Sequence, residues 1–224
     1  MKFLGCRLYE NMVSAENKFR LAVLGSGKGS NFAAIADGCA KGTIPAEIAV
    51  VVSDVADAGI LDQAQQGGIA AEFIPPGKFR TKLDEEAEAR LVTLLTGSKI
   101  NLVVLAGFMR ILKGEFLRAF AGRVINIHPA LLPAFPGLEA WKQALDYGVK
   151  VTGCTVHFVD QGIDTGPIIA QETVPVLGGD TAEKLHARIQ EAEHRLYPRV
   201  IAALAAGKIA VNGRQTIWLD EPHS

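Results

Sequence analysis

From residue 19 onward, short runs of apolar, often β-branched residues alternate with segments that repeat their apolar residues every three or four positions. Strands buried on both faces are apolar throughout, whereas helices that cover a sheet are apolar on one side only. The alternation therefore predicts an α/β fold, a doubly wound and mostly parallel sheet covered by helices. Strands are expected at Arg20–Leu24, Ile48–Val52, Ala71–Ile74, Leu102–Leu105 and Val124–Ile127. Helices are expected at Asn31–Cys39, Ile60–Gln66, Leu83–Leu95 and Lys113–Ala119.

The pattern changes after His128. The segment PALLPAFPG is rich in proline and predicts a long irregular loop directly after a strand. A long helix follows later, and a capping box of Asp180 and Glu183 is expected to start it. Residues 211–219 predict a closing hairpin around an Asn-Gly pair. Two further strands are expected at Gly153–Val159 and Ile168–Val174.

The composition narrows the classes of partner. A net charge of −1, with 23 basic and 24 acidic residues in no block, gives no footprint for nucleic acid or an anionic membrane. A small-molecule substrate is therefore expected. Three cysteines without a CxxC pair indicate neither a disulfide framework nor a zinc ribbon, which favours a reducing, cytoplasmic location. A monomer and a homodimer both stay open.

The length of 224 residues allows one large domain or two small ones. Residues 1–18 do not fit the alternating pattern and are expected to form a poorly ordered leader. Residues 19–224 are expected to form a single domain. Its first half, 19–120, is expected to be Rossmann-like and to bind a phosphate or nucleotide, and its second half, 121–224, to carry the catalytic and folate-binding residues.

The segment GSGKGSN, residues 25–31, lies between the first expected strand and the first expected helix. Glycines let backbone N–H groups turn toward an anion, and a helix N-terminus adds its positive dipole end. The spacing is neither that of a Walker A loop nor that of the dinucleotide GxGxxG motif. The segment therefore favours a phosphate cradle, and the alternative is a tight turn with Ser30 or Asn31 as N-cap.

Asn126 and His128 alternate along a strand end, so both side chains are expected on the same face. A histidine gives and takes protons near neutral pH, and an asparagine amide can donate to a developing oxyanion. The pair suits attack on a carbonyl-like carbon. The alternative is a structural histidine beside a proline-rich loop.

The segment DQGIDTGPII offers two carboxylates, Asp160 and Asp164, in an expected loop. A carboxylate near His128 raises the imidazole pKa and fixes its tautomer. Asp164 is the preferred partner because the following Gly-Pro pair constrains its loop. The alternative is a turn aspartate that hydrogen-bonds its own backbone.

Other site chemistries have less support. The five histidines show neither HExxH nor another metal-ligand spacing, so no metal is expected. A serine hydrolase is not favoured either, because GxSxG is missing.

Five segments, in this order and at natural intervals, resemble the phosphoribosylglycinamide formyltransferase family: LAVLGSGKGSN, VVLAGFMRIL, VINIHPALLPAFPG, GCTVHFVDQGIDTGPII and EAEHRLYPRVI. The resemblance covers roughly residues 20 to 219. It implies the formyltransferase fold and transfer of the formyl group of 10-formyltetrahydrofolate to the amine of glycinamide ribonucleotide, in purine biosynthesis. Any one segment is weak evidence, and five in order are strong.

The resemblance also implies roles for individual residues. Asn126, His128 and Asp164 form the implied catalytic trio, with Asp164 holding His128 protonated. The implied ribonucleotide-binding residues are Gly29, Ser30, Asn31 and Glu193. The implied folate-binding residues are Met109, Arg110, Ile111, Leu112 and the loop of Asp160, Gln161, Gly162, Ile163 and Asp164.

Two departures from the family pattern leave contacts open. Members often carry an arginine after the third strand that reaches ligand, and Arg80 and Lys82 are both candidates here. Residues 138–141 also differ from members with histidines there, which is expected to affect loop packing more than catalysis.

Two other kinds of protein compete with this assignment. Formyltransferases that act on tRNA and deformylases of formyl-folate share the fold but carry an additional domain, for which this chain has no room. A catalytically silent binding module is the alternative from another class. The presence of Asn126, His128 and Asp164 favours the enzyme.

Overall fold

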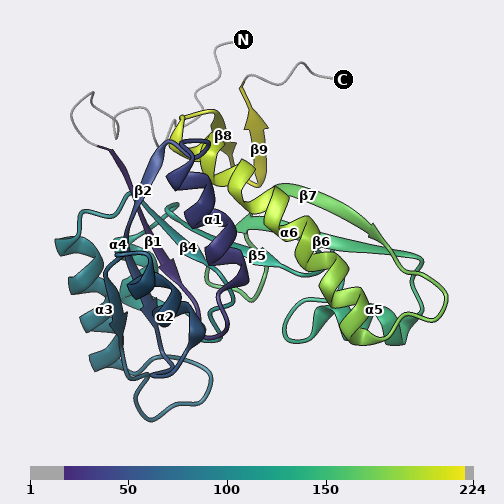
Figure 1. Ribbon diagram of the computed structural model, residues 1–224, viewed down its shortest axis with the longest axis horizontal. Helices are drawn as coiled ribbons and strands as arrows, with labels where there is room; N and C mark the ends of the chain where they lie inside the picture. The colour runs from purple at the N-terminus through teal and green to yellow at the C-terminus, as the bar shows by residue number, and fades with distance from the viewer. Residues whose placement is uncertain (1–17, 220–224) are drawn as a thin grey trace.

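The computed structural model describes residues 18–219, and its elements follow the predicted alternation (Figure 1). Almost all of the expected leader lies outside the described residues. The strands are β1 (Phe19–Leu24), β2 (Ala46–Ser53), β3 (Ala71–Phe73), β4 (Leu102–Leu105), β5 (Val124–His128), β6 (Val151–Phe158), β7 (Ile168–Pro175), β8 (Ile209–Asn212) and β9 (Gln215–Trp218). The helices are α1 (Ser30–Ala40), α2 (Gly59–Gln66), α3 (Glu85–Gly97), α4 (Gly114–Ala119), α5 (Ala140–Tyr147) and α6 (Ala182–Ala205).

Seven strands form one sheet in the order β3-β2-β1-β4-β5-β6-β7. The pairs from β3 to β5 are parallel, and β6 and β7 join antiparallel. This arrangement confirms the predicted doubly wound, mostly parallel sheet. Strands β8 and β9 form a separate antiparallel hairpin, as the Asn-Gly pair predicts.

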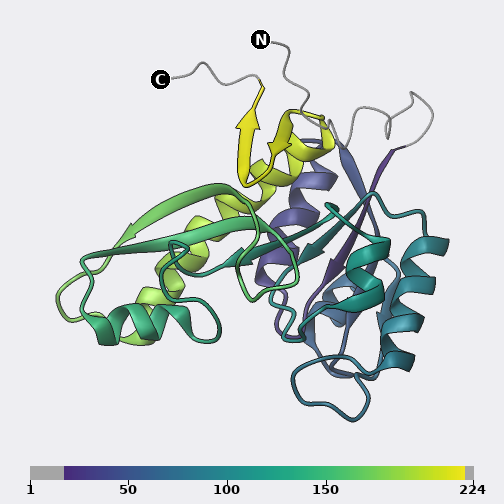
Figure 2. The same ribbon diagram turned by 180° about the vertical axis from the view of Figure 1, so that it is seen from behind.

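Helices cover both faces of the sheet. Apolar residues of α1, α2 and α6 share one core cluster, and those of α3 and α4 share the other (Figures 1 and 2). Successive β1 residues alternate between them, because side chains of a strand point to opposite faces: Leu21 and Val23 pack in the first cluster, Ala22 and Leu24 in the second. Strands buried on both sides explain the uninterrupted apolar runs of the sequence.

Two helix starts differ from the prediction. The Asp180–Glu183 capping box is wrong, because Thr181 is the N-cap of α6 and its hydroxyl accepts from the Lys184 amide. Asp180 instead forms an ion pair with Arg188. Helix α3 begins at Glu85 rather than Leu83, because the Asp84 side chain caps it.

Helix α5 was not predicted. It begins directly after the proline-rich loop, and its N-cap, Glu139, has a left-handed backbone with φ of 52° and makes no side-chain cap. Without a capping residue the helix carries no start signal in the sequence. Helix α5 packs against α6 and adds Trp141 to the edge of the first core cluster.

Candidate active site

A cavity of about 740 Å³ lies between the glycine loop, the ends of β4 and β5, the loop of residues 159–167 and α6. It is lined by every implied site residue except Gln161: the catalytic Asn126, His128 and Asp164; the ribonucleotide-binding Gly29, Ser30, Asn31 and Glu193; and the folate-binding Met109, Arg110, Ile111, Leu112, Asp160, Gly162 and Ile163. Gln161 is exposed on the same loop. Segments far apart in the sequence thus converge on one cavity.

The glycine loop is shaped for close approach of a ligand. Gly29 has a φ of 84°, and a Cβ there would lie 3.0 Å from both Cα and Cβ of Ile60, so a side chain is excluded. Gly29 itself is the N-cap of α1, and no side chain caps the helix, so the alternative with Ser30 or Asn31 as N-cap is wrong. The first-turn N–H groups of α1 are left to bind an anion.

His128 is 3% exposed, at the end of β5. Its Nε2 lies 2.8 Å from the carbonyl oxygen of Phe135, and its Nδ1 lies 3.3 Å from Oδ2 of Asp164. The proline-rich loop and the 159–167 loop thus approach the imidazole from two sides. Both ring nitrogens face an acceptor, so a proton gained by the ring is hydrogen-bonded on either side.

Burial lowers the pKa of His128, and the Asp164 carboxylate and the Phe135 carbonyl, which act in the opposite direction, do not fully offset this. Asp164 raises the pKa of His128, as expected, but in the site without ligand burial lowers that pKa by more. Burial of Asp164 raises its pKa, but the neighbouring His157 ring, the hydrogen bond from the Gly137 amide and the neighbouring His128 ring together outweigh this, so the pKa of Asp164 is lowered. These two directions favour a neutral imidazole beside an ionised carboxylate at neutral pH.

The two candidate aspartates have separate tasks. Asp160 accepts hydrogen bonds from the Gly162 amide at 3.0 Å and the Thr165 hydroxyl at 2.6 Å, so it is the turn aspartate. Asp164 has a left-handed backbone, with φ of 54°, and accepts from the Gly137 amide at 2.8 Å. The choice of Asp164 over Asp160 as the neighbour of His128 agrees with this geometry.

His157, on β6, is a polar member of the site that the sequence did not single out. Its Nδ1 lies 2.8 Å from the Phe158 carbonyl, which leaves Nε2 to accept from the Asn126 amide at 3.3 Å. The same Nε2 lies 3.6 Å from Asp164 Oδ1. His157 therefore orients the Asn126 amide. His157 is paired directly opposite Asn126 across β5 and β6. The sequence could not reveal this pairing, because the register of two strands cannot be taken from sequence alone.

Glu193, on α6, is a buried carboxylate that lines the cavity beside Asn31 of α1. It accepts from Nδ2 of Asn31 at 2.8 Å. Burial raises the pKa of Glu193 to about 7, against the smaller opposite effect of that bond. The Oδ1 atom of Asn31 is buried without a hydrogen-bond partner in the described chain, so it can accept a hydrogen bond from a ligand.

The MRIL segment combines exposed and anchored residues. Met109 is 56% exposed and Leu112 is buried. The Arg110 side chain turns toward Asp54 and toward the carbonyls of Phe79 and Arg80. Residues 109–112 therefore present backbone groups and apolar side chains to the cavity.

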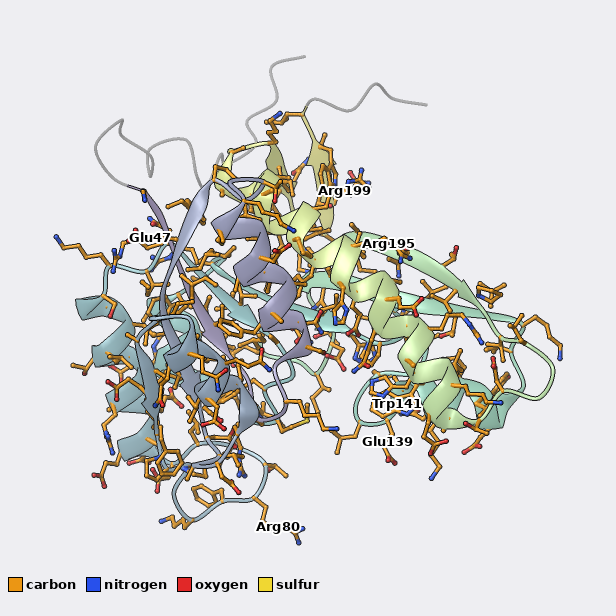
Figure 3. All side chains as sticks on the ribbon, in the orientation of Figure 1. Glu47, Arg80, Glu139, Trp141, Arg195 and Arg199 are labelled. Atoms are coloured by element: carbon orange, nitrogen blue, oxygen red, sulfur yellow. The ribbon has the colours of Figure 1, made fainter. Side chains whose placement is uncertain are left out.

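The two candidate cations after the third strand differ in position. Arg80 is exposed and its side chain points outward from the tip of its loop (Figure 3). Lys82 forms a parallel backbone bridge with Ile111, and its ammonium lies 4.3 Å from the Phe79 ring centroid. Neither residue lines the cavity.

An aromatic pair from α5 and α6 also lines the cavity. Trp141 of α5 stacks on His186 of α6, with ring centroids 3.8 Å apart and planes 4° from parallel. Both residues line the cavity, and Figure 3 places Trp141 beside α6, close to Glu139. Burial lowers the pKa of His186, so the ring is neutral at neutral pH.

Two further findings concern residues 18–219. Within this range no group of three or more His, Cys, Asp or Glu side chains could hold a metal ion. No helix in the described chain has the length and apolar character needed to cross a membrane.

An open α/β sheet whose cavity joins a glycine loop to a His–Asp pair is typical of doubly wound enzymes that act on small molecules. The family model described as formyl transferase matches residues 19–201. The chain belongs to the formyl transferase family.

Its relatives include the phosphoribosylglycinamide formyltransferase of Escherichia coli, which is 42% identical over 89% of this chain and 93% of its own. A trifunctional purine biosynthetic protein of Gallus gallus is 44% identical over 87% of this chain. The chain spans about a fifth of the length of such trifunctional relatives, 19% in that case. The crystal structure of glycinamide ribonucleotide transformylase 1 from Symbiobacterium toebii has a TM-score of 0.87 and 49% identity, and the match covers 93% of this chain and 100% of that one.

Proposed function

We propose that the chain transfers the formyl group of 10-formyltetrahydrofolate to the amine of glycinamide ribonucleotide, in purine biosynthesis. The observation that carries the proposal is one cavity that holds Asn126, His128 and Asp164 between a glycine loop and the MRIL segment. Relatives with this activity in their names match nearly the whole chain. The reaction uses two small molecules and needs no metal, nucleic acid or membrane, and it is assigned to the cytoplasm.

The amine nitrogen attacks the formyl carbon, and a tetrahedral intermediate forms. Asn126 donates an amide hydrogen to its oxygen, because His157 fixes the other hydrogen of that amide. His128, neutral at rest, takes the proton of the attacking amine directly or through a water molecule. The proton passes to the folate nitrogen as its bond to the formyl carbon breaks, and Asp164 stabilises the transient imidazolium.

The binding residues divide between the two substrates. The N–H groups at Gly29, Ser30 and Asn31 are proposed to hold the ribonucleotide phosphate, and Glu193 to accept from its hydroxyl groups. Residues 109–112 and 160–164 are proposed to hold the folate. The first half, 19–120, is proposed to bind the phosphate, and the second half, 121–224, to carry the catalytic residues and the 160–164 part of the folate site. Residues 109–112 in the first half and Glu193 in the second cross this division.

One assay tests the proposal. Purified protein is mixed with 10-formyltetrahydrofolate and glycinamide ribonucleotide, and release of tetrahydrofolate is followed by absorbance. Turnover that depends on the ribonucleotide is expected. Release of formate with water as acceptor, or formylation of methionyl-tRNA instead, would overturn the assignment.

His128→Asn tests the role of the imidazole. This variant keeps a polar side chain but removes the titrating group, so turnover is expected to fall by a factor on the order of 10² to 10⁴. Ribonucleotide binding, measured by calorimetry, is expected to survive. His194→Asn is the matched control, because His194 lies on α6 and does not line the cavity. Equal turnover of the two variants would remove His128 from its role.

A further inference from the structure

Asp54 follows β2 directly and is only 5% exposed. It does not line the cavity and touches none of the catalytic trio, so the proposed reaction leaves it without a task. A buried carboxylate is costly unless it is paired and hydrogen-bonded. The partners of Asp54 therefore indicate why the chain keeps a charge at this position.

The two carboxylate oxygens of Asp54 hold two different walls of the cavity. Oδ1 accepts from the hydroxyl of Ser26, in the glycine loop. Oδ2 accepts from Nε of Arg110, in the MRIL segment, at 2.6 Å. The Ser26 hydroxyl also accepts from the Met109 amide at 2.9 Å. Asp54, Ser26, Met109 and Arg110 thus form a closed ring of hydrogen bonds. The ring holds the Met109 amide and the Arg110 side chain.

The ring extends to the loop after β3. The Nη1 atom of Arg110 donates to the carbonyl of Phe79 at 3.1 Å and to that of Arg80. The Ile111 amide donates to the Thr81 carbonyl at 2.8 Å. Nε and Nη1 of Arg110 thus form hydrogen bonds inside the protein, so this side chain holds the segment to Asp54 and to the loop after β3.

We infer that Asp54 is a positioning residue of the transfer reaction, through which the glycine loop and the Met109–Arg110 segment are held in one arrangement. The inference rests on the proposed function, which assigns the first segment to the ribonucleotide and the second to the folate. One carboxylate then fixes the relative position of both subsites, and the distance between amine and formyl group depends on it. The proton transfer at His128 does not depend on Asp54.

The test is a steady-state comparison of Asp54→Ala and Asp54→Asn with the unchanged protein. Asp54→Ala is expected to raise the KM of both substrates by about tenfold or more, as for a lost hydrogen bond to a charged group. Asp54→Asn keeps the shape and one acceptor oxygen, so its two KM values are expected to lie in between. The kcat of both variants is expected to change far less than KM.

Ser26→Ala supplies the second measurement. If Ser26 acts through Asp54, the double variant Ser26→Ala/Asp54→Ala is no worse than Asp54→Ala alone. Asp57→Asn is the matched control, because Asp57 lies three residues further on and is exposed. It is expected to leave both KM values unchanged.

Three results would overturn the inference: a lower melting temperature with both KM values unchanged, a rise in KM for one substrate only, or additive effects of the two alanine substitutions. Failure of the proposed function is a separate result, namely no turnover by the unchanged protein. In that case calorimetry with tetrahydrofolate and with inorganic phosphate decides. Asp54→Ala is expected to weaken the binding of both, and unchanged binding of either one would overturn the inference.

Discussion

Burial disfavours the ionised form of the Glu193 side chain in the protein without substrate. The pKa of Glu193 lies at about 7, above the ordinary 4.5, because the folded protein disfavours its ionised form. The stability that the protonated form provides is complete below pH 4.5 and is lost as the pH rises toward 7. Glu193→Gln removes the ionisation, so the variant is expected to be more stable than the unchanged protein at pH 8, by up to about 3 kcal/mol.

Urea unfolding at pH 5 and at pH 8 measures this difference. The gap between variant and unchanged protein is expected to widen from pH 5 to pH 8. Glu191→Gln is the control, because Glu191 lies on the exposed side of the same helix, and it is expected to show no such change. A gap of equal size at both pH values would show that Glu193 ionises as freely in the folded protein as in the unfolded chain.

Single residues of the site could be predicted where a short sequence motif marks them. The alternation of Asn126 and His128 placed both on one cavity wall, and the Gly-Pro pair favoured Asp164 over Asp160. His157 and Asp54 were not found, because their partners come from other strands and loops. The resting charge of His128 was also beyond the sequence, since it depends on how deeply the ring is buried.

At the scale of elements, side chains of β6 and β7 hold the proline-rich loop by hydrogen bonds to its backbone. Thr155 and Gln171 form this clamp. The buried Thr155 hydroxyl donates to the Ala130 carbonyl at 2.6 Å and accepts from the Leu132 amide at 3.0 Å. Gln171 donates to the Leu132 carbonyl at 2.9 Å. The clamp fixes the loop that offers the Phe135 carbonyl to His128.

Thr155→Val is expected to lower the free energy of unfolding by about 1–3 kcal/mol, because two buried backbone groups lose their partner. Turnover is expected to fall as well, since the loop shifts relative to His128. Urea unfolding and the transfer assay measure the two effects. Thr173→Val, at an exposed position of β7, is the control. If both variants behave alike, the clamp has no part in stability.

Helices whose apolar residues repeat between two strands were predicted even where no side chain caps them, as in α1, α2 and α4, whereas α5 was not predicted. Asp84 caps α3, and the apolar face of α6 made that helix evident even though its first residue was misplaced. Helix α5 begins at a left-handed Glu139 without a cap, and its position depends on packing against α6. Tertiary contacts, which no local pattern records, define such an element.

At the scale of the whole molecule, α6 ties the two halves of the sheet together. Tyr197 is fully buried, and its hydroxyl lies 2.9 Å from the Leu105 carbonyl and 3.2 Å from the Ile125 carbonyl. These carbonyls belong to β4 and β5, on either side of the boundary at residue 120. The overall architecture followed from the alternation of strands and helices, but this joint did not.

Tyr197→Phe is expected to lower the free energy of unfolding by about 1–3 kcal/mol, because the two carbonyls lose a buried donor without loss of ring packing. Urea unfolding gives the value. Tyr147→Phe is the control, because Tyr147 is 79% exposed. An equally small effect in both variants would mean that packing alone holds α6 to the sheet.

The stack of Trp141 on His186 gives the molecule a built-in optical probe. The chain has two tryptophans, and Trp141 lines the cavity whereas Trp218 lies on β9 beneath the Arg199 guanidinium. A ligand that enters the cavity changes the surroundings of the first indole and leaves those of the second as they are. Fluorescence emission can therefore report occupancy of the cavity in real time, with Trp218 as an internal reference and no added label.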